Sequence, residues 1–344
     1  MLKIAIITAY FGKLPAYFSI WLKSCKENTN IDFYVVTDQK IDIDNLPENV
    51  KILEMTFDSL RSLINKKLEM QVTLDRPYKL CDFKPAYGFI FGEYLKNYDY
   101  WGHCDIDLVW GDLSSFFEKY KLEEYERFLD RGHLSLYRNT YKMNHLFMTT
   151  TKEIDFRKVY STSESCYFDE SGMYDITVNS GVPFFRDCLY ADIDLFHYDF
   201  RHASHPSKPF NYKKQLFFWE KGKVFQAYAE GNRISRNEWC YLHFQKRTME
   251  HIDSAVLNSD MFYITNTGFW AAKEIPDISE IEALNPRGKF KENLNRREYV
   301  VCGKANLNGR EFLRFVINWG KIIVCSSSFW NKWFKRLWIK AKRI

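Results

Sequence analysis

Asp105 and Asp107, one residue apart, are the side chains of this sequence best suited to bind a metal ion. The apolar and aromatic residues at 99–104 predict a buried strand that ends directly before the pair. Open α/β sheets bind ligands at this edge. Carboxylate oxygens suit Mg²⁺ or Mn²⁺, and such an ion would neutralise a leaving diphosphate as a Lewis acid. An Asp-x-Asp triplet also occurs as an ordinary solvated turn. The position of this triplet directly after a buried apolar run favours a metal site, because burying unpaired carboxylates costs free energy.

His243, far downstream, could complete such a site. It lies in a short strand-like segment at 241–244, within the stretch 239–247, and three residues before Lys246. Imidazole is an acceptable third ligand for Mn²⁺, and an ammonium group stabilises the charge that develops on a leaving diphosphate. Judged by these residues alone, a half-buried strand histidine followed by a surface lysine is the more ordinary interpretation.

A βαβ unit at the start of the chain is expected to position these groups. Apolar runs at 3–9 and 31–37 predict buried parallel strands, and the apolar spacing at 16–26 predicts a helix between them, with a right-handed crossover. The other expected elements are strands at 50–55, 99–104, 133–137 and 241–244 and helices at 57–74, 86–96 and 112–120. The polar residues at 277–295 predict a connecting segment.

The order of these features resembles the glycosyltransferases of the GT-A fold, in which a nucleotide-binding βαβ half precedes an Asp-x-Asp motif at a strand end. At 78–85 and 98–113 the sequence looks like a bacterial group of these enzymes from capsule and exopolysaccharide gene clusters. The resemblance implies an α/β, GT-A-like fold with a Rossmann-like nucleotide-binding βαβ half and a mixed central sheet, and we expect a C-terminal helical extension after it. It also implies a catalytic domain at 1–250, with a nucleotide-sugar half at about 1–113 and an acceptor half at about 114–250, before a C-terminal extension at 251–325.

The resemblance further implies roles for single residues. Asp105, Asp107 and His243 would bind Mn²⁺ (or Mg²⁺), Asp105 would also lie near the ribose, and Lys246 would contact the diphosphate. The implied activity is transfer of a sugar from a UDP-sugar to a glycan acceptor in cell-surface polysaccharide synthesis.

Residues at the ends of the first two predicted strands are candidates for nucleotide-sugar binding. Thr8, Ala9 and Tyr10 close the first strand, where Tyr10 could stack on the base, and Asp38 ends the second and could accept a hydrogen bond. Lys84 precedes a predicted helix and could face the diphosphate. Ordinary capping or core packing is an equal alternative for each. The chain contains neither G-x-G-x-x-G nor a P-loop, which disfavours a dinucleotide or P-loop site.

An acidic cluster formed by Asp169, Glu170 and Asp175 could act on the acceptor side. An inverting transferase needs a base near the acceptor hydroxyl, whereas a retaining one does not. The cluster could supply that base or contact the acceptor. A solvated acidic loop is the competing interpretation.

Residues 326–344 carry six basic side chains and no acidic one. The whole chain carries +5, so the rest is nearly neutral and has no general nucleic-acid-binding signature. The tail predicts a helix with an aromatic face opposite a basic face, as in helices that lie in a membrane surface; docking on the protein's own core is the alternative. With no signal-peptide pattern at the start, we expect a cytoplasmic protein attached peripherally to the inner face of the cell membrane, meeting a lipid-linked acceptor.

Two other functions fit part of this pattern. A metal-dependent nucleotidyltransferase also uses paired carboxylates on an α/β sheet, but it needs a glycine-rich basic loop after the first strand. The segment 8–15 holds one glycine and one lysine. A catalytically inactive, membrane-attached carbohydrate-binding protein is the second alternative.

Overall fold

The computed structural model describes residues 2–42, 46–203, 210–289 and 292–293. The predicted basic helix at 326–344 and residues 294–325 of the predicted extension lie outside these residues. None of the helices in the described part of the chain combines the length and apolar composition that a membrane-spanning segment requires.

The chain forms two compact units that alternate along the sequence. The first consists of Met1–Tyr190, Trp219–Val224 and Glu238–His243, and the second of Ala191–Phe218, Phe225–Asn237 and Phe244–Ile344. Every candidate site residue named above except Lys246 falls in the first unit. Each unit is described separately below.

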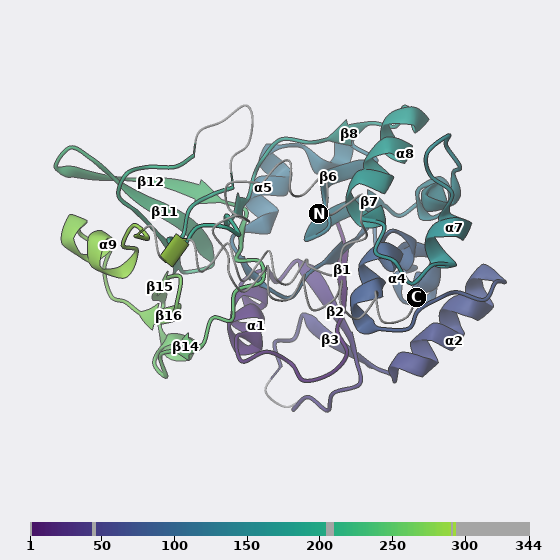
Figure 1. Cartoon of the computed structure of the whole chain (residues 1–344), viewed down its shortest axis with the longest axis horizontal. Helices are drawn as coiled ribbons and strands as arrows, with labels where there is room; N and C mark the ends of the chain where they lie inside the picture. The colour runs from purple at the N-terminus through teal and green to yellow at the C-terminus, as the bar shows by residue number, and fades with distance from the viewer. Residues whose placement is uncertain (1, 43–45, 204–209, 290–291, 294–344) are drawn as a thin grey trace, which may run out of the picture. The chain divides into compact units, whose positions relative to one another are not determined.

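A seven-stranded mixed sheet forms the centre of the first unit (Figure 1). Its order is β3-β2-β1-β4-β7-β6-β8. The strands are β1 (Ile4–Ala9), β2 (Ile31–Thr37), β3 (Val50–Glu54), β4 (Tyr100–Cys104), β6 (Arg127–Arg131), β7 (Leu134–Arg138) and β8 (Phe184–Phe185). The strands β3, β2, β1 and β4 run parallel, whereas β7 is antiparallel to both β4 and β6. The predicted α/β class, with a βαβ start and a mixed central sheet, is confirmed.

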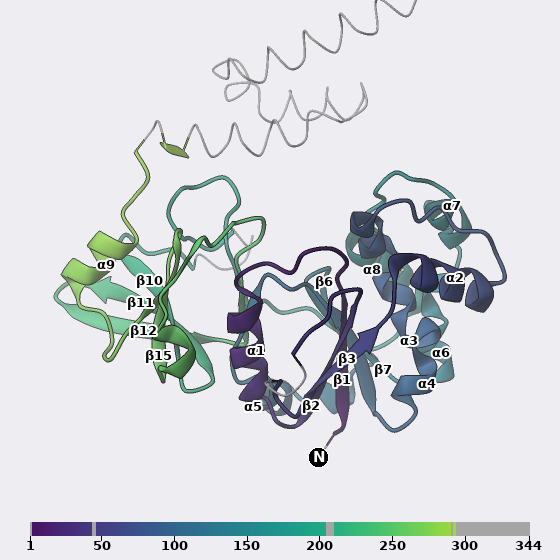
Figure 2. The same ribbon diagram turned by 90° about the horizontal axis from the view of Figure 1, so that it is seen from below.

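Helices cover both faces of this sheet. The helices α1 (Phe18–Lys26) and α5 (Leu113–Lys119) lie on one face, and α3 (Tyr87–Ile90), α4 (Gly92–Leu95) and α6 (Tyr141–Asn144) lie on the other (Figure 2). The remaining helical segments of this unit are α2 (Phe57–Leu68), η2 (Pro77–Ala86), η3 (Leu122–Glu124), η4 (Leu146–Met148), α7 (Phe156–Tyr160), η5 (Phe168–Gly172) and α8 (Met173–Ser180). Burial on both faces explains why the parallel strands are continuous apolar runs.

Two predicted helices are shorter than expected. The helix expected at 57–74 stops at Leu68, because Glu69 adopts a left-handed conformation (φ 52°) and its N–H caps the helix on the Asn65 carbonyl. The helix expected at 86–96 is two short helices separated at Phe91. In both places the apolar spacing continues after the backbone has left the helical conformation.

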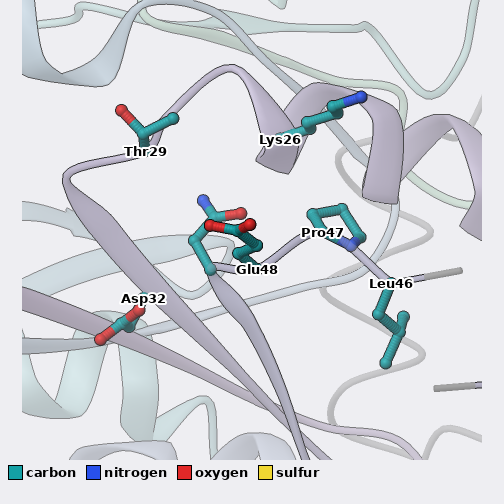
Figure 3. A pocket seen from close by; sticks show the side chains of 7 residues that line it. Lys26, Thr29, Asp32, Leu46, Pro47 and Glu48 are labelled. Carbon is teal, nitrogen blue, oxygen red and sulfur yellow. The ribbon is translucent and has the colours of Figure 1, made fainter. Parts of the chain in front are cut away.

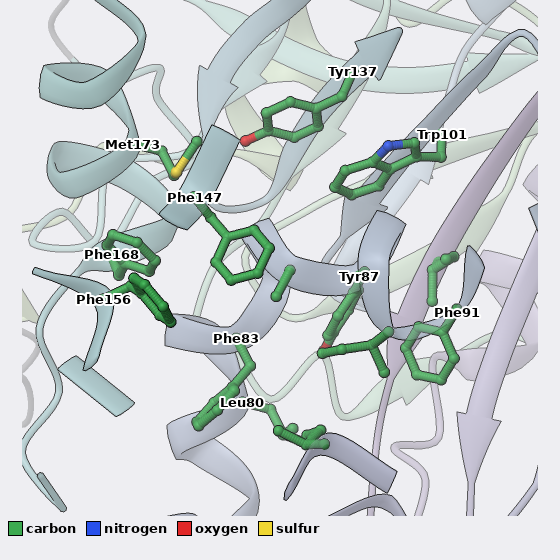
Figure 4. Close-up of a cluster of buried hydrophobic side chains, with 14 of the residues drawn as sticks. Leu80, Phe83, Tyr87, Phe91, Trp101, Tyr137, Phe147, Phe156, Phe168 and Met173 are labelled. Carbon is green, nitrogen blue, oxygen red and sulfur yellow. The ribbon is translucent and has the colours of Figure 1, made fainter. Parts of the chain in front are cut away.

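Aromatic side chains fill much of the core on the α3 side of the sheet (Figure 4). Trp101 and Tyr137 stack with ring centres 4.6 Å apart, and Phe83 stacks on Tyr160 at 4.2 Å. Each fully buried ring contributes roughly 1.5–3 kcal/mol by leaving water. Many of the aromatic residues behind the 18% fraction are therefore core residues in the described part of the chain.

A six-stranded sheet in the order β12-β11-β10-β15-β16-β14 dominates the second unit. Its elements are β10 (Gln215–Glu220), β11 (Lys223–Glu230), β12 (Arg233–Trp239), β14 (His251–Ile252), β15 (Met261–Ile264), β16 (Gly268–Ala271) and the short helix η6 (Val256–Asn258). Helix α9 (Ile278–Leu284) packs Ile281 into a cluster with Leu216 and Met261. This helix replaces the first part of the connecting segment predicted at 277–295, and a capping box between Asp277 and Glu280 starts it.

Candidate metal and donor site

The ends of parallel strands place the predicted donor residues along one edge of the sheet. Strand β1 pairs with β2 through Ala9 and Val36, and with β4 through Ile7 and His103. The segments that follow these strands therefore emerge at the same edge.

A short antiparallel pair brings His243 to the two aspartates. Strand β5 (Leu108–Trp110) follows Asp107 directly, and it pairs with β13 (Tyr241–His243) so that His243 lies opposite Leu108. Nε2 of His243 lies 3.4 Å from Oδ1 of Asp107. One ligand atom from each of Asp105, Asp107 and His243 lies within 4.8 Å of the others. The three residues predicted to hold the metal ion are therefore neighbours in space.

The donor set of this cluster fits a divalent transition-metal ion. It offers two carboxylates that are partly exposed and one imidazole that is buried. Oxygen ligands suit both Mg²⁺ and Mn²⁺, while an imidazole favours Mn²⁺ over Mg²⁺. Ion binding itself stays a prediction.

Close backbone packing fixes the position of β5 against β13. A Cβ on Gly111 would lie 2.6 Å from the Trp239 carbonyl oxygen and 2.9 Å from that of Cys240. The buried Asn28 side chain donates to the Gly111 carbonyl (2.9 Å) and accepts from the Leu113 N–H (3.0 Å). These contacts hold the strand end that follows Asp107.

Lys84 lies beside the aspartate pair and is almost fully buried, with 6% of its surface exposed. Its Nζ donates to Oδ1 of Asp105 (2.5 Å), to the Gly132 carbonyl (2.9 Å) and to Oδ2 of Asp169 (3.2 Å). Burial lowers the pKa of the Lys84 ammonium, but Asp105 and Asp169 outweigh burial and hold that pKa well above its usual range. All three ammonium protons are engaged, so Lys84 orients Asp105; its predicted contact with the diphosphate stays a prediction.

Asp169 is the buried member of the predicted acidic cluster. Burial raises the pKa of the Asp169 carboxyl to about 7, Lys84 opposes this shift, and Asp105 and Glu170 add to it. A Cβ on Gly132 would lie 2.5 Å from Oδ2 of Asp169, so a larger residue in this turn would displace the Asp169 carboxylate. Glu170 and Asp175 are partly exposed. The cluster therefore has two kinds of member, one paired in the interior and two that solvent reaches.

A second buried ion pair supports the segment that leads to Asp169. Lys79 and Asp82 are fully buried and lie 2.9 Å apart. Nζ of Lys79 also donates to the carbonyls of residues 159 and 164, and the Asp82 carboxylate accepts from the N–H groups of residues 166 and 168. One ten-residue segment, η2, thus carries both the lysine that holds Asp105 and the pair that holds the chain before Asp169.

Two tyrosines lie close enough to the aspartate pair to interact with its charge. Burial raises the pKa of the Tyr10 hydroxyl, and the nearby Asp107 carboxylate raises it further. Burial also raises the pKa of Tyr17, with further contributions from Asp107, Tyr10 and Asp105. Tyr10 was a predicted donor residue; Tyr17 was not, because it precedes a helix and carries no local motif.

The other predicted donor residues occupy the same sheet edge. Thr8 is buried and Ala9 is partly buried at the end of β1. Asp38 is exposed after β2 and accepts from the Gly12 N–H (3.1 Å) and the Gln39 side chain (2.8 Å). Lys246 belongs to the second unit, where its backbone is left-handed (φ 51°). Its predicted contact with the diphosphate stays a prediction.

A cavity of about 510 Å³ in the first unit lies elsewhere (Figure 3). Lys26, Asp32 and Glu48 are among the residues that line it. Asp32 stands at the beginning of β2, whereas Asp105 follows the end of β4, which is parallel to β1 and hence to β2. The cavity is therefore at the opposite edge of the sheet from the metal cluster.

Comparisons with known proteins identify a family but no activity. A family model described as "Family of unknown function (DUF6625)" matches residues 6–273. No curated protein matches the chain significantly.

Two solved glycosyltransferases show weak structural similarity. The galactosyltransferase LgtC, in complex with donor and acceptor sugar analogues, aligns with a TM-score of 0.31 and 12% identity over 55% of this chain and 75% of that chain. The glycosyltransferase GlyE of Streptococcus pneumoniae TIGR4 aligns with a TM-score of 0.29 and 14% identity over 54% of this chain and 45% of its own. Similarity at this level carries no conclusion about activity.

Proposed function

Because the chain belongs to the DUF6625 family, whose function is unknown, we propose its function from the site: a metal-dependent glycosyltransferase that moves a sugar from a UDP-sugar to a glycan acceptor. The observation that carries this proposal is the cluster of Asp105, Asp107 and His243, whose ligand atoms lie within 4.8 Å of one another. The cluster stands where parallel strands of a βαβ half end, which is where α/β sheets bind nucleotides.

Different side chains would bind different parts of the donor. Asp105, Asp107 and His243 would bind Mn²⁺ or Mg²⁺, and the bound ion would neutralise the charge of the leaving diphosphate. Tyr10 and Asp38, at the ends of the two N-terminal strands, are placed for the base and ribose.

Lys84 is assigned a positioning role. Its 2.5 Å contact fixes one carboxylate oxygen of Asp105, so that the metal ligand does not have to be ordered when the donor binds. Among the acidic cluster, Glu170 and Asp175 are the partly exposed members and are better placed to meet an acceptor hydroxyl than the buried Asp169.

We also propose where the enzyme works. The basic, aromatic segment at 326–344 has the composition of a helix that lies in an anionic membrane surface. Attachment to the inner face of the cell membrane would bring the site to a lipid-linked acceptor of capsule or exopolysaccharide synthesis. This part of the proposal is supported by the sequence alone.

The test is release of UDP from a panel of UDP-sugars with and without Mn²⁺. We expect Mn²⁺-dependent hydrolysis of at least one donor, and its loss in Asp107→Ala with the fold intact by circular dichroism. The exposed Asp58, replaced by alanine, serves as the control and should leave hydrolysis unchanged.

A parallel assay with nucleoside triphosphates and sugar phosphates separates the alternatives. A nucleotidyltransferase would instead release pyrophosphate from a nucleoside triphosphate and a sugar phosphate. An inactive carbohydrate-binding protein would release neither product. Wild-type protein that binds and hydrolyses no UDP-sugar with any divalent ion would refute the proposal, and wild-type turnover in Asp107→Ala would refute the site.

A further inference from the structure

His133 stands at the same sheet edge as the metal cluster, although no sequence pattern marks it. It occupies the turn between β6 and β7. Its carbonyl oxygen accepts from the Asp105 N–H at 3.2 Å, and the neighbouring Gly132 carbonyl accepts from Lys84. The turn is therefore bonded directly to the segment that carries the aspartates.

The His133 ring is held on three sides. Only 4% of the residue is exposed. The ring packs edge-on against Tyr190 and Tyr241, with ring centres 4.8 and 5.5 Å apart. Its third neighbour is His243, whose ring centre is 4.3 Å away at an interplanar angle of 36°. The imidazole thus has a fixed orientation beside a candidate metal ligand.

The two ring nitrogens of His133 differ in their surroundings. Nδ1 lies 2.9 Å from the Tyr241 hydroxyl. Nε2 is buried and has no hydrogen-bond partner among the described residues. An unpaired buried polar atom costs about 1–3 kcal/mol, and in native proteins it often marks a bound ion or water. In the tautomer whose Nδ1–H donates to Tyr241, Nε2 keeps a free lone pair, which is the arrangement found in metal-bound histidines.

We propose that His133, through Nε2, is a further ligand of the divalent ion held by Asp105, Asp107 and His243, and that the Tyr241 hydroxyl fixes its tautomer. The inference rests on the proposed function. The proposal adds the His133 imidazole to the metal ligands, and it adds the hydrogen bond between His133 and Tyr241 as the contact that orients this ligand.

The spacing of the two imidazoles suits one shared ion. Nitrogen ligands each about 2.1 Å from an ion are at most about 4.2 Å apart, and rings bound at right angles have centres about 4.5 Å apart. The rings of His133 and His243 have centres 4.3 Å apart, and a nitrogen of one lies within 4.8 Å of a nitrogen of the other. A shift of less than about 1 Å satisfies both distances between the imidazoles. His133 and the two aspartates are each grouped with His243 but not with one another within 4.8 Å, so binding of one shared ion also requires His133 to approach the aspartates.

A second imidazole changes which metal the site selects. Mg²⁺ prefers oxygen ligands, whereas Mn²⁺ and Co²⁺ bind imidazole readily. A site with two carboxylates and two imidazoles should therefore prefer Mn²⁺ and Co²⁺ to Mg²⁺. Removing His133 should weaken Mn²⁺ and Co²⁺ binding more than Mg²⁺ binding.

The experiment titrates the full chain with Mn²⁺ alone, following the free ion by electron paramagnetic resonance, and repeats the titration with Mg²⁺ as competitor. His133→Phe keeps an aromatic ring against the two tyrosines, and we expect it to lose at least about tenfold in Mn²⁺ affinity. Tyr241→Phe removes only the hydroxyl and should lose about 10–100-fold, as outer hydrogen-bond partners of metal ligands do. The control His145→Ala replaces a partly exposed histidine outside the metal cluster and should bind Mn²⁺ like wild type.

A second readout counts nitrogen ligands. Electron spin-echo modulation of the Mn²⁺-loaded protein should show two imidazole couplings in wild type and one in His133→Phe. Unchanged Mn²⁺ affinity and an unchanged nitrogen count in a folded His133→Phe would overturn this inference and leave the proposed function standing. Failure of wild type to bind Mn²⁺ would overturn both.

Discussion

Replacing Lys84 by methionine tests the central contact of the site most directly. Methionine has a similar length and no charge, so the variant removes the ammonium and leaves Asp169 without its cation. Breaking a buried ion pair in this way costs about 3–5 kcal/mol. Asp169 is the source of most of this cost because it is 5% exposed, whereas the Asp105 side chain is 33% exposed and can be rehydrated.

This loss should depend on pH in a defined direction. The pKa of Asp169 is raised to about 7 in the folded protein, above its unfolded value of 3.8. Such a carboxyl contributes stability that is fully present below pH 3.8 and is lost as the pH rises through about 7. Without Lys84 the folded pKa rises further, so Lys84→Met should be more destabilising at pH 8.5 than at pH 5.5.

Thermal unfolding and urea titration at the two pH values measure this prediction. For a unit of this size we expect a fall in Tm of roughly 6–20 °C. In a double-mutant cycle, Lys84→Met combined with Asp169→Asn should lose less than the two single variants together, by about 0.5–3 kcal/mol. Lys121→Met, which removes an exposed lysine paired with Glu124, is the control. Additive single losses, or equal losses at both pH values, would refute this account of the buried pair.

Three further predictions concern other parts of the chain. Gly111→Ala should separate β5 from β13, lower stability by about 1–3 kcal/mol and weaken Mn²⁺ binding, as measured by urea titration and metal titration; wild-type metal affinity would contradict the role given to this strand pair. Lys79→Met should cost about 3–5 kcal/mol because Asp82 is fully buried, and Asp82→Asn in the same chain should recover part of it. Deleting 326–344 should abolish sedimentation with anionic vesicles while UDP-sugar hydrolysis continues; unchanged sedimentation would exclude this segment as the anchor.

The sequence predicts the strand framework of the first unit well, for a physical reason. Strands buried on both faces are continuous apolar runs, and those at 4–9, 31–37 and 100–104 stand out between polar segments. Helix ends are harder to predict, because a single left-handed residue such as Glu69 stops a helix whose apolar spacing continues. The capping box of Asp277 and Glu280 is a sequence pattern that indicates the start of a helix, and α9 begins there within the segment predicted as a connection.

The candidate site also contains residues that the sequence predicted and contacts that it could not predict. Asp105, Asp107 and His243 could be predicted because a family resemblance supplied their common role. The contacts of Lys84 with Asp169, and of His133 with His243, could not. Each joins segments that lie far apart in the sequence. Packing of η2 against η5 brings Lys84 to Asp169, and the pairing of β6 with β7 and of β5 with β13 brings His133 to His243.

The interleaving of the two units also governs when the site can form during synthesis. Asp107 and His243 are 136 residues apart, and the last segment of the first unit ends at His243 itself. At a synthesis rate of about 5–20 residues per second, roughly 7–27 s pass between the emergence of the aspartates and that of the histidine. For most of that interval the nascent chain has the two aspartates and His133 but lacks His243. We therefore expect full-strength metal binding to appear late in biogenesis, after chain segments of the second unit have already been made.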